Sequence, residues 1–115
     1  MSRKSLPYAD ELEESILGGL IVSSKELPLC EPYLNEQDIW GSPKCWRLYN
    51  IIKRMKSTNV PIDLTTICTK ISADDKVLAI DDNWVTGLNE KAALPWKMEY
   101  YAEQIYEKYI QRKVI

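Results

Sequence analysis

The sequence contains no histidine and no phenylalanine, and only four of its 115 residues are glycine. Without histidine, the chain lacks the most common general acid–base group of enzymes and the usual nitrogen ligand of zinc. Its three cysteines, Cys30, Cys45 and Cys68, are widely spaced and form no Cys-x-x-Cys motif. The composition therefore argues against a zinc site or a disulfide framework and predicts buried, reduced cysteines.

Sequence patterns for catalysis and for membrane insertion are also lacking. There is no Walker phosphate loop, no His-Glu-x-x-His motif and no nucleophile elbow. The neighbouring carboxylates Glu13-Glu14, Asp74-Asp75 and Asp81-Asp82 would point apart on a helix, so we expect them to cap helix ends. We predict a cytoplasmic, non-catalytic chain that contacts no membrane and holds no cofactor or metal.

The charge balance is slightly acidic, with a formal net charge of −2. This balance argues against a domain whose main task is binding a phosphate backbone. One basic cluster, formed by Arg47, Lys53, Arg54 and Lys56, is predicted to be the solvent-exposed face of a helix. The alternative is a helix-turn-helix module that uses this cluster to bind DNA, with a steep salt dependence.

Apolar residues recur at helical spacing and nowhere alternate as in a strand, so the fold class is all-α. After a flexible lead-in over residues 1–8, one domain is predicted over residues 9–115. The helices are expected at 9–22, 26–34, 43–57, 64–71, 83–89 and 95–115, with 72–76 as a loop. The pair Gly18-Gly19 lies inside the first helix, where it costs stability, and indicates close approach of another helix.

The last predicted helix is apolar on two faces. The inner stripe is predicted to pack inside the domain and the outer stripe to contact a partner. The inner stripe consists of Met98, Tyr101, Ala102, Ile105 and Tyr109. The outer stripe consists of Tyr106, Ile110 and Val114, and the further interface candidates are Trp84, Leu88, Trp96 and Tyr100. Packing of this outer stripe against the domain itself is the alternative.

Three sequence blocks, in order, resemble the N-terminal domain of the DnaB family of bacterial replicative DNA helicases. The first contains Leu6-Pro7, Glu11, Glu13, Ser15 and Leu17-Gly18-Gly19-Leu20. The second contains Leu48-Tyr49 and Pro61-Ile62-Asp63-Leu64. The third contains Tyr101-Ala102, Ile105, Glu107, Arg112 and Ile115. Together these blocks span nearly the whole chain.

The helix pattern predicts a helical globule over residues 9–72 and an αα-hairpin over residues 82–115 that projects from the globule or packs beside it. The resemblance implies a collar domain whose hairpins pair within a hexamer and which receives primase and a helicase loader during DNA replication. ATP, magnesium and DNA would be bound by a RecA-like domain that this chain lacks. A stand-alone adaptor or loader-like protein that resembles the collar is the alternative, and the sequence beyond residue 115 would distinguish the two.

Overall fold

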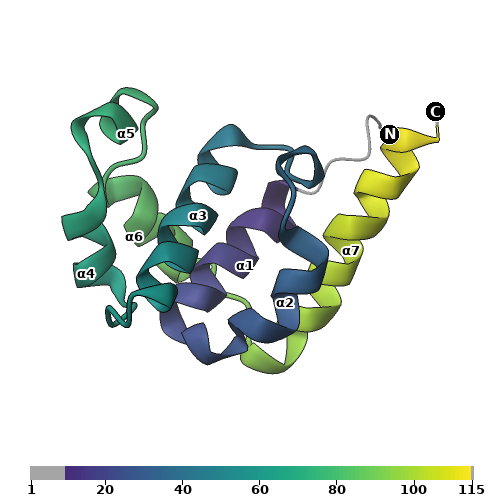
Figure 1. The fold of residues 1–115 in the computed structure, drawn as a ribbon, viewed down its shortest axis with the longest axis horizontal. Coiled ribbons are helices and arrows are strands. Elements are labelled where there is room, and N and C mark those ends of the chain that lie inside the picture. The colour runs from purple at the N-terminus through teal and green to yellow at the C-terminus, as the bar shows by residue number, and fades with distance from the viewer. Residues whose placement is uncertain (1–9, 115) are drawn as a thin grey trace.

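The computed structural model describes residues 10–114, and these residues form seven α-helices joined by short connections (Figure 1). The helices are α1 (Asp10–Val22), α2 (Leu27–Leu34), α3 (Pro43–Ser57), α4 (Leu64–Lys70), α5 (Ala73–Val77), α6 (Asp82–Glu90) and α7 (Pro95–Lys113). Two 3-10 turns, η1 (Ser24–Glu26) and η2 (Gln37–Ile39), precede α2 and α3. The predicted all-α class is confirmed, while the predicted lead-in over residues 1–8 lies outside the described residues.

Side-chain caps fix the starts of several helices. The Ser42 hydroxyl accepts a hydrogen bond from the amide of Cys45, with Pro43 at the first position of α3. The Asp63 carboxylate accepts from the amide of Thr66 at 2.8 Å and opens α4. These local signals are why helix starts were predicted to within one or two residues.

The predicted loop over residues 72–76 is wrong, because this segment contains the short helix α5. Ser72 and Asp75 form a reciprocal capping box in which each side chain accepts from the other residue's amide. At its far end, the amide of Ile80 donates to the carbonyl of Asp75 at 3.0 Å, and Ala79 adopts a left-handed φ of 65°. A five-residue helix is too short to give a periodic apolar pattern.

Helix α1 lies at the centre of the molecule and contacts α3, α6 and α7 (Figure 1). Its residues from Ile16 to Ile21 are all buried. Gly18 and Gly19 allow the closest approach, because a Cβ at Gly18 would lie 2.0 Å from the carbonyl oxygen of Leu88. The predicted close approach at this glycine pair is confirmed, and the segment that approaches is the end of α6 together with the connection to α7.

Helices α6 and α7 follow one another as predicted, but both pack on α1 and make few direct contacts with each other. Helix α6 also contacts α4, whereas α7 lies along α2 at the other side of the molecule (Figure 1). The connection between them is tied to α1, since the amide of Ala93 donates to the carbonyl of Ser15 at 2.9 Å. The last two helices therefore pack as part of one compact globule.

Within residues 10–114, no helix combines the length and the hydropathy needed to cross a membrane.

Candidate protein-interaction surface

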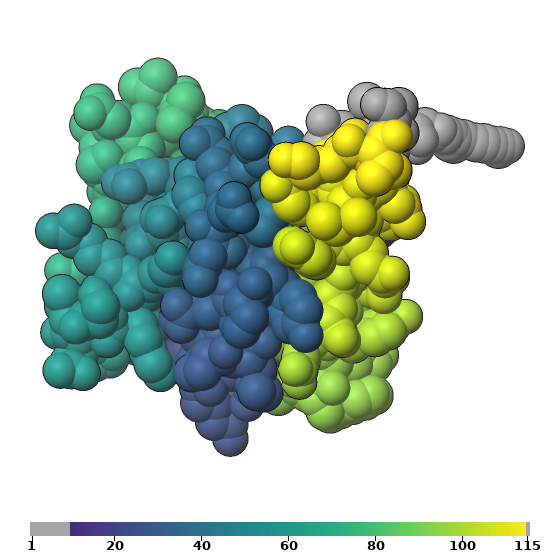
Figure 2. Space-filling model, turned by 45° about the vertical axis from the view of Figure 1, so that its right-hand side comes forward, coloured from purple at the N-terminus to yellow at the C-terminus, as the bar shows by residue number. Residues whose placement is uncertain are grey.

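The two faces of α7 are distributed as the sequence predicted. Met98, Ala102, Ile105 and Tyr109 are buried against α1 and α2, and Tyr101 is half-buried. The opposite face of α7 is turned to solvent. Figure 2 shows α7 in yellow-green at the surface of the molecule, beside α2 in blue. This helix thus closes the core with one face and leaves the other exposed.

The exposed face of α7 carries large apolar and aromatic side chains. We name these five residues the α7 stripe: Trp96, Tyr100, Tyr106, Ile110 and Val114. Their exposed fractions run from 36% for Tyr106 to 79% for Val114. At helical spacing, Trp96, Tyr100, Ile110 and Val114 share one side of α7, and Tyr106 lies at its edge, where its ring contacts Tyr33 of α2 edge-on.

The two interface candidates on α6 behave differently from the α7 stripe. Leu88 is 1% exposed and lies in the core, so it is left out of the surface. Trp84 is half-buried, and the ammonium group of Lys44 lies 4.4 Å from the centre of its ring. Because α6 packs far from the exposed side of α7, these residues do not extend the α7 stripe.

The C-terminal part of α7 is attached to the loop before α3 by a polar contact. The Arg112 guanidinium donates to the carbonyl oxygens of Asp38 at 2.8 Å and Ile39 at 3.1 Å. These bonds join residues more than seventy positions apart and fix the end of the helix that carries the α7 stripe. Arg112 belongs to the third sequence block, but no local pattern in the chain predicts this contact.

The same loop is held from its other side by Glu13, a residue expected only to favour the start of its own helix. Its carboxylate is buried and accepts from the amides of Gly41 at 2.7 Å and Ser42 at 3.2 Å. Burial raises the pKa of Glu13 to about 7, although both amides act in the opposite direction. Nearby Asp10 raises this pKa further and Arg112 lowers it. Glu13 therefore links α1 to the start of α3.

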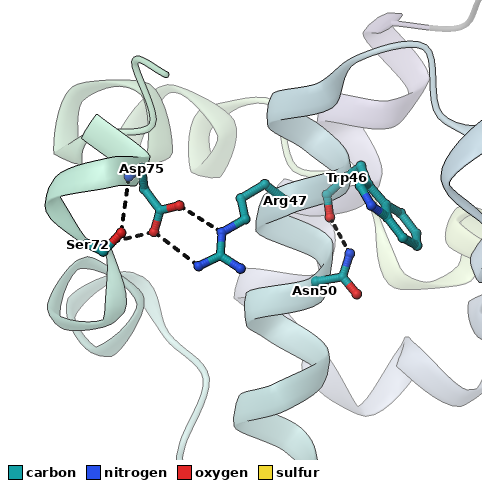
Figure 3. A network of polar contacts seen from close by, with 5 residues as sticks. All are labelled: Trp46, Arg47, Asn50, Ser72 and Asp75. Carbon is teal, nitrogen blue, oxygen red and sulfur yellow. Dashed lines mark hydrogen bonds and ion pairs between the residues drawn. The ribbon is translucent and has the colours of Figure 1, made fainter. Parts of the chain in front are cut away.

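A third long-range polar contact connects α3 with α5 (Figure 3). Arg47 Nε donates to the buried Asp75 carboxylate at 2.7 Å, and a terminal nitrogen of Arg47 donates at 3.4 Å. The Arg47 guanidinium, followed by the amide and hydroxyl of Ser72, lowers the pKa of Asp75 to about 2. The carboxylate is thus held charged, and it serves both the cap of α5 and the contact with α3.

We expect Asp75→Ala to lower the free energy of unfolding by about 1–3 kcal/mol at pH 7, because it removes charge-assisted hydrogen bonds. Wild-type stability from this group should be fully present above about pH 4 and decline as the pH falls toward 2, because the folded pKa is depressed. Urea denaturation at pH 7 and pH 3 measures both effects. The exposed neighbour provides the control, and equal losses for Asp75→Ala and Asp74→Ala would contradict the assignment.

The cysteines are placed largely as predicted and carry no sign of redox chemistry. Cys30 and Cys45 are buried, Cys68 is half-buried, and all three are free. Burial raises the thiol pKa of Cys30 and Cys45 to about 12, which suppresses the reactive thiolate. In the described part of the chain, no three His, Cys, Asp or Glu side chains gather in a group that could hold a metal ion. The main feature of the described surface is the exposed face of α7.

These features define a class of protein: an α-helical domain that presents an exposed apolar helix face. The comparisons then identify the family. The model of the family described as "DnaB-like helicase N terminal domain" matches residues 5–107. The chain belongs to this family.

Two relatives and one solved structure agree with this membership. The chain is 24% identical over 109 residues to "Replicative DNA helicase DnaB" of Rhodothermus marinus and 24% identical over 110 residues to "Replicative DNA helicase DnaC" of Bacillus subtilis. The alignments cover 94% and 95% of this chain but only 12% and 24% of those proteins. The N-terminal domain of DnaB helicase from Mycobacterium tuberculosis has the same fold, with a TM-score of 0.83 at 20% identity over 96% of this chain and 80% of that one.

Proposed function

We propose that this chain acts as the N-terminal collar domain of a hexameric replicative DNA helicase. In this role it pairs with a second copy through the α7 stripe and offers docking sites for primase and a helicase loader. The observation that supports this proposal most directly is the α7 stripe. It keeps tryptophan, tyrosine and aliphatic side chains exposed along α7 and at its C-cap residue. Such residues are typical anchors of protein interfaces, and an isolated soluble domain gains nothing from exposing them together.

ATP hydrolysis and unwinding are proposed for the assembled helicase and not for the residues of this chain. The relatives whose names state a replicative helicase are four to eight times longer than the matched region. DNA would then be held by the motor part of the assembly, in keeping with the net charge of −2 found here.

Self-association can be tested by sedimentation equilibrium of the purified chain at micromolar concentrations. We expect a reversible dimer of the wild-type chain. Val114→Glu and Ile110→Glu should each raise the dissociation constant of this dimer by at least about tenfold. A charged side chain placed in the centre of an apolar contact must lose its hydration without gaining a partner.

Val77→Glu provides a matched control, because Val77 is an equally exposed valine, at 84% against 79% for Val114, on the distant helix α5. This control should dimerise like the wild type. A strictly monomeric wild-type chain, or a dimer that responds equally to both valine substitutions, would argue against pairing through the α7 stripe.

A further inference from the structure

The solvent-exposed side of α3 carries a concentration of positive charge on an otherwise acidic molecule. Arg47 and Arg54 lie seven positions apart on the same side of this helix, which places them roughly 10 Å apart along its axis. We define the basic face by five side chains: Arg47, Lys53, Arg54 and Lys56 on α3, and Lys70 at the end of α4. Lys70 was not grouped with the others from sequence, since it comes from a different helix.

Most of these charges are not neutralised within the domain. Among residues 10–114, no ion pair involves Arg54, Lys56 or Lys70. The ammonium group of Lys53 donates to the neutral side-chain oxygen of Asn35. Arg47 uses one edge of its guanidinium for Asp75 and remains 48% exposed (Figure 3). The four lysine and arginine side chains of the basic face other than Arg47 raise the local positive potential, which favours the binding of negative charge.

The surface around these charges is hollowed on both sides of the line from Arg47 to Arg54. One hollow of about 300 Å³ lies toward α4 and is lined by Ile51, Met55 and Lys70 beside the two arginines. The other, of about 480 Å³, lies toward α2 and includes Leu27, Lys53 and Lys56. The hollows thus have cationic rims, and their apolar residues Leu27, Ile51 and Met55 lie buried beneath them, at most 6% exposed.

We propose that the basic face binds an acidic, amphipathic helical segment of a partner protein. Carboxylates at positions i and i+7 of such a helix repeat at the same spacing as Arg47 and Arg54, because both helices rise by the same distance per residue. Apolar side chains between the carboxylates would enter the two hollows and cover the small exposed parts of Ile51, Met55 and Leu27. Arginine forks pair well with carboxylates, and this pairing gives the contact its specificity.

Charge distribution favours a protein segment over nucleic acid as the occupant. Glu31 lies in the wider hollow, where it would repel a continuous phosphate backbone, and the chain as a whole is negatively charged. A peptide can place a polar or apolar side chain opposite Glu31, whereas a polynucleotide repeats its negative charge at every residue.

The test uses a fluorescein-labelled 18-residue amphipathic helix with glutamates at i and i+7 separated by leucines, measured by anisotropy with the purified chain. We expect salt-dependent binding that is lost when both glutamates are replaced by glutamine. Arg54→Glu/Lys56→Glu should weaken binding by at least about tenfold, because it reverses two exposed charges on the face.

A matched control reverses two lysines, Lys97 and Lys108, on α7, which lies on the other side of the molecule from α4, and should bind within about twofold of the wild type (Figure 1). Equal binding by the face variant and this control would overturn the proposal. So would tighter binding of a 20-base single strand or duplex that the face variant abolishes, because the occupant would then be nucleic acid.

The inference deepens the partner-docking role proposed above but does not depend on pairing through α7. Ile110→Glu should therefore bind the acidic peptide like the wild type, whether or not the chain dimerises. If the chain dimerises but does not bind the peptide, the proposed role of the basic face is refuted and the pairing through α7 is not. If the chain binds the peptide but stays monomeric, the pairing is refuted and the role of the basic face is supported.

Discussion

Replacing Gly18 by alanine is expected to destabilise the domain by more than about 3 kcal/mol, which lowers the melting temperature by roughly 10 °C or more. The added Cβ would lie 2.0 Å from the carbonyl oxygen of Leu88 and 2.9 Å from the Cα of Ala92. Both are backbone atoms, so relief requires α6 and the connection to α7 to move away from α1. Thermal and urea denaturation followed by circular dichroism would measure the loss.

Two further glycines make this experiment a graded series. A Cβ at Gly19 meets the flexible end of Met98 at 2.8 Å and the backbone oxygen of Ala93 only at 3.1 Å, so Gly19→Ala should cost less, about 1–2 kcal/mol. A Cβ at Gly87 meets nothing within 4 Å, so Gly87→Ala in α6 should stabilise by about 0.5–1 kcal/mol through helix propensity. A different order, above all a neutral Gly18→Ala, would show that α1 and α6 do not approach as described.

The buried carboxyl of Glu13 should make the stability of the domain fall as the pH rises. Its folded pKa is about 7 against an ordinary 4.5, so between these values the folded state binds more protons than the unfolded state. The stability contribution is fully present below about pH 4.5 and is lost as the pH rises through 7. From pH 5 to pH 8 this loss is about 2 kcal/mol.

Glu13→Gln tests this directly, because glutamine does not titrate and offers one acceptor oxygen to the two amides of Gly41 and Ser42. We expect the variant to be about 1–3 kcal/mol less stable than the wild type at pH 5. The gap should narrow by about 2 kcal/mol at pH 8. Glu11→Gln, an exposed change of equal charge in the same helix, should leave the pH profile unchanged. A wild-type profile that parallels Glu13→Gln would contradict the buried titration.

The helices and their starts could be predicted from sequence because their signals lie within a few residues. The hydroxyl of Ser42 and the carboxylate of Asp63 each cap an amide three positions further on. The two faces of α7 follow from its own periodicity in the same way. Helix α5 was missed although Ser72 and Asp75 form a local capping box, because its five residues are too few to show an apolar period.

The two candidate surfaces were likewise only partly predictable from the sequence. The α7 stripe could be chosen from helical spacing alone, but spacing could not tell that Leu88 faces α1 and is buried. Likewise, four members of the basic face lie on one helix and were grouped from sequence, whereas Lys70 joins them only because α4 folds back beside α3.

The sequence by itself determined an all-α chain, its helix starts, the need for small residues at Gly18-Gly19 and the double face of α7. Each of these depends on propensity, capping or periodicity within a few turns of helix. Only the tertiary structure decided that α6 and α7 both pack on α1, and that Glu13 and Arg112 hold the loop before α3. Those contacts join residues 28 to 74 positions apart, and no local pattern in the chain specifies which distant groups will meet.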